Sequence, residues 1–536
     1  ENDVNSGNPY DFASFTFRKK SGFFDCVTYS GNGVHGRAIA HGLNGPVGMI
    51  IIKRTDAVGY WATTHKNSAP LTLNTSLEDN NTASVQNGYA PPASLSETTF
   101  TLYHYNSNMD AVNASGGTYV AYLFADNSSE DAEDQMIKCG SYTGNGSAGH
   151  EINLGWEPQF IIQKHTSGAS NWQMYDSMRG VTTGGNDSRL YPNLSNAEDS
   201  SEKIEFNSTG FSLMSTSGHT NQSGQTYIYM AIRAPMMKEP EAATDVFAID
   251  TIGATNGGTL PSYVSGFPVD MLIQARRDAD NNMLLTRLLG ETKLFTNLTN
   301  GESAESDADF DYQDGVFSNT SVDVNRLGCM WKRAKGFFDV VATKSLNSSV
   351  NHNLGVTPEL VIYKRRDTTY FDWYVCSTAN GFGTLNTTAQ FGGTGNGAGV
   401  GAVYANATAT TVSGGYVFVG STSADMIIYL FASLDGISKF GSYTGNGSNQ
   451  TIDCGFSAGS RFILIKRTDA VGDWYFWDSA RGIVAGNDPH LSLNTTAAEV
   501  TSDDSVDPAN SGFIVNQVAA TNINVSSGTY IFYAIA

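Results

Sequence analysis

The sequence predicts an all-β chain, a tandem array of five β-sandwich modules of jelly-roll or lectin-like type, each of about 100 residues. An apolar strand motif recurs five times at intervals of 89 to 111 residues. Only 15% of the residues are charged and 56 are glycine, which favours short strands joined by turns. No window of helical length shows a sustained 3.6-residue period.

The recurring motif is a short apolar strand that ends in a basic residue in four of its five copies. The copies begin at Met49, Phe160, Met271, Leu360 and Phe462. Their residues are apolar without alternation. An antiparallel strand with one face in solvent would instead alternate apolar and polar residues. We therefore expect both faces of this strand to be covered, one by the module core and the other by a neighbouring module, a loop or a second subunit.

A tight turn and a tryptophan follow the strand, and together they predict a hairpin with the tryptophan on its return strand. The third copy has Leu284 and Leu285 in this region. The repeated tryptophans are either core anchors, the favoured interpretation, or a platform on which sugar rings stack. They are Trp61, Trp172, Trp373 and Trp474.

Two further repeated segments complete each module. Gly-Asn-Gly segments, such as 31–33, 144–146 and 445–447, predict hairpin turns that need positive φ. Modules end in an aromatic, alternating strand, for example at residues 119–125 and 530–536. Short connections predict that neighbouring modules pack into a stiff rod.

Similarities among the copies define three module types in the order A-B-C-A-B. Residues 1–20 match the end of a type-C module, so we expect them to be the terminal strand of a truncated upstream module, left with unpaired backbone groups unless another chain supplies the rest. The predicted domains are 21–126 (type A), 135–234 (type B), 244–334 (type C), 335–433 (type A) and 436–536 (type B).

Charge and hydropathy exclude two classes of partner. The net charge of −21 argues against nucleic acid as a partner, because phosphate binding needs a basic face, and it also argues against an anionic membrane surface. No run of about 18 apolar residues occurs, so no membrane insertion is expected.

The five cysteines are predicted to be buried free thiols. Cys139 stands where another module has Phe440, Cys454 matches Leu154, and Cys26 matches Val340. Such a scattered, odd-numbered set is typical of a protein that folds in a reducing cytoplasm.

No motif predicts catalysis, a metal site or a cofactor. The repeated pairs Asp176 with Arg179 and Asp478 with Arg481 are interpreted as structural ion pairs in short turns, worth under about 1 kcal/mol if exposed. The acidic runs 307–311 and 278–282 lack the glycine and glutamate of a calcium loop. No HExxH or GxSxG motif occurs, and no acidic pair recurs in every module, so we expect a non-enzyme without assigned ligand-binding residues.

The motifs Gly-Phe-Phe-Asp, Tyr-Thr-Gly-Asn-Gly-Ser, Ile-Lys-Arg-Thr-Asp and Asp-Ser-x-Arg-Gly, in this order, resemble repeats of large structural proteins of marine tailed phages, including cyanophages. The resemblance implies a virion fibre or surface appendage that contacts the host, assembled in the bacterial cytoplasm and displayed on the virion. Its partners would be copies of itself, other virion proteins and host surface glycans. The alternatives are a bacterial extracellular filament or adhesin, and a carbohydrate-binding lectin or enzyme.

Overall fold

The computed structural model describes most of the chain and divides it into two compact units. The N-terminal unit comprises Glu1–Tyr175, Arg189–Asp199 and Ser212–Ala234, and the C-terminal unit comprises Asp176–Ser188, Ser200–Phe211 and Pro235–Ala536. The described residues are 13–76, 95–102, 111–127, 135–181, 186–201, 203–234, 237–251, 261–305, 308–310, 312–318, 323–343, 349–377, 381–391, 407–413 and 425–536.

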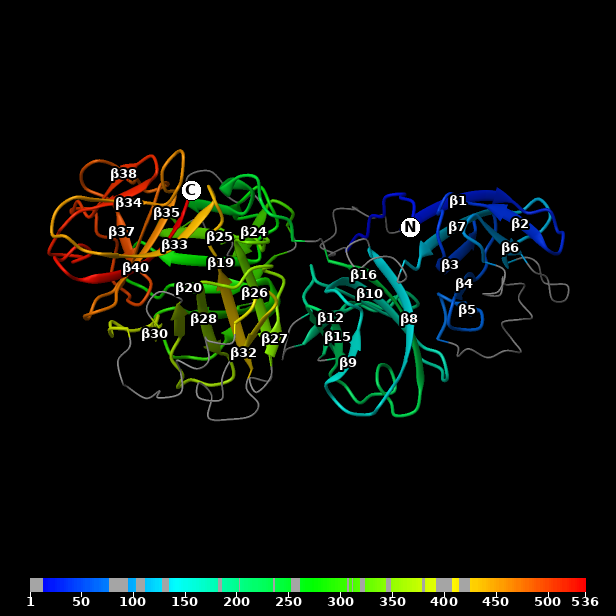
Figure 1. The fold of residues 1–536 in the computed structure, drawn as a ribbon. Helices are drawn as coiled ribbons and strands as arrows, with labels where there is room; N and C mark the ends of the chain where they lie inside the picture. The colour runs from blue at the N-terminus through cyan, green and yellow to red at the C-terminus, as the bar shows by residue number, and fades with distance from the viewer. Residues whose placement is uncertain are drawn as a thin grey trace. The chain divides into compact units, whose positions relative to one another are not determined.

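The fold is all-β, as predicted, and five antiparallel main sheets follow one another along the chain (Figure 1). In each sheet the last long strand lies between the first strand and the apolar strand, and the return strand of the hairpin comes next. The strand orders are β1-β7-β3-β4-β5, β8-β16-β10-β11, β17-β25-β19-β20-β21-β22, β26-β32-β28-β29-β30 and β33-β40-β35-β36-β37.

The strands of the first two main sheets are β1 (Phe24–Ser30), β3 (Val47–Arg54), β4 (Trp61–His65), β5 (Leu71–Thr72), β7 (Thr118–Ala125), β8 (Ile137–Thr143), β10 (Pro158–His165), β11 (Gln173–Asp176) and β16 (Thr226–Arg233). Those of the third are β17 (Phe247–Thr251), β19 (Met271–Arg276), β20 (Met283–Thr286), β21 (Thr292–Phe295), β22 (Ser303–Ala304) and β25 (Arg326–Trp331). Those of the last two are β26 (Phe338–Thr343), β28 (Leu360–Arg365), β29 (Tyr374–Ser377), β30 (Gly381–Thr384), β32 (Met426–Phe431), β33 (Ser438–Thr444), β35 (Phe462–Arg467), β36 (Trp474–Asp478), β37 (His490–Ser492) and β40 (Thr529–Ile535).

Shorter strands complete the modules. They are β2 (Arg37–Ala40), β6 (Thr99–Leu102), β9 (His150–Asn153), β12 (Asp187–Arg189), β13 (Asp199–Ser201), β14 (Ile204–Asn207), β15 (Gly210–Leu213), β18 (Tyr263–Val264), β23 (Ala308–Asp309), β24 (Gly315–Ser318), β27 (Ser349–Asn351), β31 (Thr411–Ser413), β34 (Gln450–Asp453), β38 (Val506–Ala509) and β39 (Gly512–Val515). Two short 3-10 helices, η4 (Ala243–Asp245) and η5 (Arg287–Leu289), also occur. In the described part of the chain no helix is long and apolar enough to cross a membrane.

Each module of the C-terminal unit has a core of its own, built from alternate residues of the apolar strand. Leu272 of β19, Val361 of β28 and Ile463 of β35 belong to three separate clusters of buried side chains. Second sheets close the other side of these cores, with the orders β18-β24-β23, β27-β31 and β34-β39-β38. One face of each apolar strand is therefore buried inside its own sandwich.

The opposite face of the same strands enters a single larger core that the three C-terminal modules share. Met271 and Ile273 of β19, Leu360 and Ile362 of β28, and Phe462 and Leu464 of β35 are all buried in that one cluster. The prediction that both strand faces are covered is confirmed. The expectation of a rod is wrong for residues 237–536, because the three main sheets face one another instead of following in a line.

The Gly-Asn-Gly segments differ from the predicted hairpin turns. Each joins a main-sheet strand to a strand of another sheet, as between β1 and β2 or between β33 and β34. The second glycine does adopt positive φ, 70° at Gly33 and 75° at Gly447. The first glycine lies close to another backbone segment: a Cβ atom on Gly445 would lie 2.3 Å from the Val525 carbonyl oxygen. This close approach explains why the position is glycine.

Residues 13–19 form no strand, although residues 1–20 were predicted to be one. Residues 1–12 lie outside the described part of the chain. In the C-terminal unit the matching strand, β25, pairs with β17 on one side and β19 on the other. Within the described residues the segment 13–19 has no such flanking strands, so no ladder of hydrogen bonds fixes it.

Candidate functional site

The lysine that ends the apolar strand and the tryptophan of the return strand form one buried unit. Lys364 is fully buried, and its Nζ donates to the carbonyl oxygens of Phe371 at 2.6 Å and Thr299 at 2.8 Å. The Nζ lies 5.8 Å from the centre of the Trp373 ring. Phe371 belongs to the same hairpin, whereas Thr299 belongs to the preceding module, so the lysine also joins two modules.

Burial lowers the pKa of these lysines. The pKa of Lys364 falls to about 8, with desolvation as the main cause and the charge of Asp372 opposing it. Lys466 behaves in the same way, with a pKa of about 8 and Asp473 as the opposing charge. A charge held away from water in this manner is stabilised by the carbonyl groups that accept from the Nζ and by the nearby carboxylate.

The tryptophan position makes the most regular contact between modules, and we call it the clamp position. In the C-terminal unit its side-chain N–H donates to a backbone carbonyl oxygen of the neighbouring module. The three acceptors occupy equivalent places on strands β21, β30 and β37. The three bonds are Trp373 to Phe295 at 2.9 Å, Trp474 to Thr384 at 2.9 Å, and Asn282 to Ser492 at 2.9 Å.

These three bonds close a ring. The second type-A module binds the type-C module, the second type-B module binds that type-A module, and the type-C module binds the type-B module. Each interface is heterologous, and three such interfaces return to their starting point, as in a cyclic trimer. We call this arrangement the C-terminal ring.

Asn282 holds the clamp position in the module that lacks a tryptophan, where the sequence pointed to Leu284 and Leu285. Its side chain is 2% exposed and donates to Thr495 as well as to Ser492. Its backbone N–H donates to the Asn297 side chain at 3.3 Å. In the other modules an asparagine accepts from the backbone N–H of the tryptophan in the same way, for example Asn386 from Trp373. This repeated asparagine is the signal that would have located Asn282.

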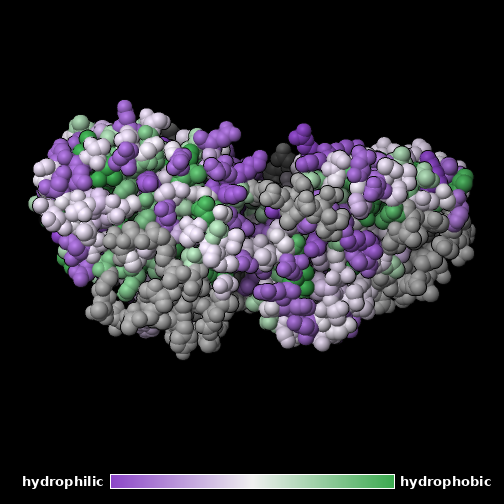
Figure 2. Space-filling view, in the orientation of Figure 1, coloured by the Kyte–Doolittle hydropathy of each residue, from purple (hydrophilic) through white to green (hydrophobic). Residues whose placement is uncertain are grey.

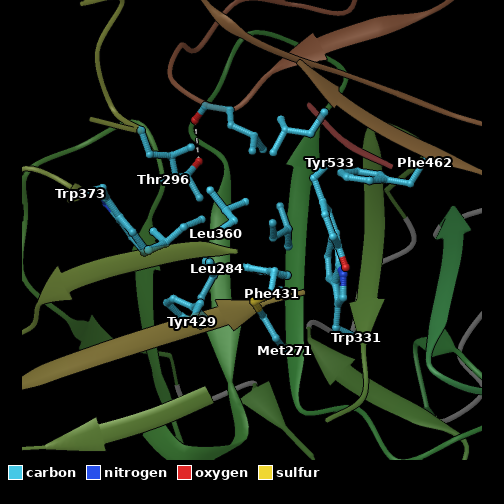
Figure 3. Close-up of a pocket in the computed structure, with 15 residues that line it drawn as sticks. Met271, Leu284, Thr296, Trp331, Leu360, Trp373, Tyr429, Phe431, Phe462 and Tyr533 are labelled. Atoms are coloured by element: carbon cyan, nitrogen blue, oxygen red, sulfur yellow. Dashed lines mark hydrogen bonds between the residues drawn. The ribbon is translucent and has the colours of Figure 1, made fainter. Parts of the chain in front are cut away.

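A small apolar cavity lies where the three sheets meet (Figure 3). It has a volume of about 40 Å³. Its lining residues come from all three modules, among them Met271 of β19, Leu360 of β28 and Phe462 of β35. The lining is apolar. The Thr296 hydroxyl donates to the Leu493 carbonyl at 2.6 Å, whereas the Trp331 indole N–H has no hydrogen-bond partner among the described residues. Apolar space of this size is a packing defect with room for one small group, and it offers no chemistry to a substrate.

The third interface of the ring also carries charge. Glu499 accepts from Arg277 of the type-C module at 3.0 Å and from Arg481 of its own module at 3.2 Å. Arg481 in turn binds Asp478. The Asp/Arg pairs are structural ion pairs, as interpreted. The energy given for an exposed pair does not apply to Arg481 and Asp478, because their side chains are 1% and 0% exposed.

The N-terminal unit repeats one of the three ring contacts. Trp172 of the type-B module donates to the carbonyl oxygen of Thr72 of the type-A module at 2.9 Å, the counterpart of the bond from Trp474 to Thr384. Lys164 adds a bond to the Ser76 carbonyl at 3.2 Å. The two pairs, each made of one type-A and one type-B module, therefore pack in the same way.

The interpretation of the tryptophans as core anchors is confirmed at three positions. Trp172, Trp373 and Trp474 are 1%, 0% and 2% exposed, so a sugar could not stack on them and that alternative is wrong there. Trp61 is half-buried. The sequence did not reveal that this anchor lies between modules.

The other predicted features hold structural places. Four of the cysteines, Cys139, Cys329, Cys376 and Cys454, are buried free thiols, and Cys26 is partly exposed. Asp278 binds Arg276 at 2.7 Å, whereas Asp307 and Asp311 lie outside the described residues. Across the described ranges no group of three or more His, Cys, Asp or Glu side chains is placed to hold a metal ion.

Together the sheets and their contacts define a tandem array of β-sandwich modules that pack through a repeated clamp. The chain belongs to a family described as a domain of unknown function (DUF7483), whose model matches residues 13–235 and 313–536. Both matches begin toward the end of a type-C segment and continue through a type-A and a type-B module. No curated protein matches the chain.

Proposed function

We propose that the chain is a non-enzymatic virion structural protein, a fibre or surface appendage of a tailed phage that contacts the host cell surface. Its partners are other copies of itself and other virion proteins, with host surface glycans as the recognised ligand. It is assembled in the bacterial cytoplasm and acts on the virion surface.

The observation that carries this proposal is the use made of the repeated residues. The lysine, the tryptophan and the asparagine that recur from module to module contact backbone groups of their own or the adjoining module. They do not converge on a solvent-facing site, which is what a catalytic centre requires. A chain that commits its repeated residues to holding modules together is suited to a mechanical role.

Two further observations agree with this role. The buried thiols of Cys376 and Cys454 have pKa values raised to about 12 by desolvation, which keeps them in the unreactive thiol form during cytoplasmic assembly. On the face drawn in Figure 2, hydrophilic residues separate the hydrophobic ones, as expected when most apolar side chains are used inside the modules.

The test is to purify tailed-phage particles whose genome encodes the chain and to measure by mass spectrometry whether it is present in stoichiometric amounts. Immunogold labelling with an antibody against the purified chain then locates it. Label on fibres or on the particle surface supports the proposal. Label on the bacterial envelope, with none on particles, would establish the filament or adhesin alternative instead.

The lectin and enzyme alternatives need a separate assay. The purified chain is applied to a glycan array and incubated with host surface polysaccharide. If the chain binds glycans and is also found on particles, the two results agree with an appendage that recognises the host. Release of oligosaccharide would contradict the non-enzymatic role.

A further inference from the structure

The N-terminal unit contains two members of a ring that has three members in the C-terminal unit. Its type-A and type-B modules pack through Trp172 and Thr72, as the second type-A and type-B modules do through Trp474 and Thr384. The two contacts that a type-C module makes in the C-terminal ring have no counterpart within the described residues of the N-terminal unit.

The surface of the first type-A module that would face a type-C module is incompletely buried. Trp61 is half-buried, whereas its counterpart Trp373 is fully buried and donates to the type-C module. In the described structure the indole N–H of Trp61 makes no hydrogen bond, while its ring lies 5.6 Å from Lys53 Nζ. Among the described residues, the tryptophan at the clamp position of this module therefore has no acceptor for its indole N–H.

Two neighbours of Trp61 show the same difference. Leu73, whose backbone N–H donates to the Trp61 carbonyl, is partly exposed, whereas Leu385 in the same place is 2% exposed. Tyr122 on β7 is partly exposed, whereas its counterpart Tyr429 is 1% exposed. Trp61, Leu73 and Tyr122 are thus partly exposed, whereas their three counterparts are buried in the C-terminal ring. We call these three side chains the open face.

Residues 13–20 reproduce the junction at which a type-C module passes into a type-A module. Lys19 binds Asp25 at 3.2 Å, as Arg333 binds Asp339 at 2.6 Å. The Lys20 N–H donates to the Phe24 carbonyl at 2.9 Å. In the later copy the Ala334 N–H donates to the Phe338 carbonyl at the same distance. The backbone leaves this junction in the same way in both copies.

The aromatic side chain that precedes the junction also takes the same place. Phe17 contacts Phe124 at 5.4 Å between ring centres and Phe160 at 6.4 Å. In the C-terminal ring Trp331, the last residue of β25, contacts Phe462 at 5.6 Å, and Phe462 is the counterpart of Phe160. The end of a type-C module is thus seated against its two neighbours.

We infer that the open face binds a third module of the 244–334 type, whose last strand is formed by residues 13–17. This module presents apolar residues equivalent to Met271, Ile273 and Leu284 to Tyr122 and Leu73. It offers backbone carbonyls equivalent to those of Phe295 and Leu298 to the Trp61 indole. A type-C module within a second copy cannot serve, because its own face is already buried in that copy's ring.

The test uses an extended chain in which a duplicate of residues 238–326 is joined directly to residue 13. Hydroxyl-radical footprinting followed by mass spectrometry reports the accessibility of Trp61, and hydrogen exchange reports residues 13–19. We expect both rates to fall by at least about tenfold, because a strand paired on both sides exchanges only through larger openings.

The matched control is the same extended chain with Met271→Asp and Ile273→Asp in the duplicate alone. Leu272 and the other side chains of the duplicate's own sandwich remain, so protected amides on the duplicate of β19 show that it has folded. In this control Trp61 is expected to react as fast as in the original chain.

Two results would overturn the inference. One is an unchanged Trp61 rate in the extended chain although the duplicate is folded. The other is self-association of the original chain, detected by sedimentation, that protects Trp61 without any extension, since a second copy would then be the occupant.

Discussion

Replacing Trp474 with alanine tests whether the C-terminal modules share one core. Trp474 is 2% exposed and its indole donates to the Thr384 carbonyl of the preceding module. Removing a buried tryptophan side chain costs about 3–5 kcal/mol, and the abandoned carbonyl adds about 1–3 kcal/mol. Because partial collapse of the site offsets some of this, we expect a loss of about 5 kcal/mol in the free energy of unfolding.

The assay is hydrogen exchange measured peptide by peptide along a urea titration, since a chain of several modules does not give a single two-state curve. Trp474→Ala is expected to lower the opening free energy of β35 and β36, and equally of β28 in the type-A module and β19 in the type-C module. The matched control is Trp61→Ala at the same repeat position. Trp61 is half-buried and should cost about 2 kcal/mol or less, within the N-terminal unit alone.

The distribution of the loss decides the outcome. A loss confined to residues 436–536, with β19 and β28 unchanged, would mean that the modules fold independently. The shared core described above would then be refuted. Equal losses of unfolding free energy for Trp474→Ala and Trp61→Ala would likewise refute the distinction between Trp474, which contacts a neighbouring module, and Trp61, which is half-buried.

Three further predictions concern the C-terminal ring. Asn282→Ala removes the bonds to Ser492 and Thr495 and should lower the urea midpoint of this unit by the equivalent of about 1–3 kcal/mol; an unchanged midpoint would mean that the third interface carries no energy. Glu499→Gln leaves Arg481 without one of its two carboxylate partners and should cost about 3 kcal/mol by the same measurement, with 1 M salt having little effect on a buried pair. Lys364 and Lys466 have folded pKa values near 8 against 10.5 unfolded. The unfolded chain therefore binds more protons between these values, and stability should rise with pH from about 8 to about 10.5. Lys466→Met should remove about half of that rise, and a slope unaffected by this substitution would contradict the burial of its charge.

The sequence predicted the modules and the strands that build them because those features repeat. Five copies of the apolar strand, beginning for example at Met49 and Phe462, made the period visible. The hairpin that follows was also predictable, because a turn and a tryptophan recur eight or nine residues after the lysine in four of the copies. Burial of Trp172, Trp373 and Trp474 followed from their position beside an apolar strand.

The ring could not be predicted, for two physical reasons. An apolar strand without alternation indicates that both of its faces are covered, but it does not indicate what covers each face. The sequence therefore could not show that Leu272 lies inside the sandwich and Ile273 in the shared core. The closing contact joins Asn282 to Ser492, which lie 210 residues apart in the chain. A polar side chain replaces the tryptophan there, so the repeated tryptophan could not point to it, and only the repeated asparagine marks the position.

The arrangement of the C-terminal modules is tested most directly by an experimental structure of the purified chain at a resolution that defines side chains. We predict that Asn282 Nδ2 lies at hydrogen-bond distance from the Ser492 carbonyl, 2.9 Å, and that Trp373 and Trp474 make the two equivalent bonds. Three modules in a row, with Asn282 in water and residues 335–433 separating it from Ser492, would contradict the closed ring.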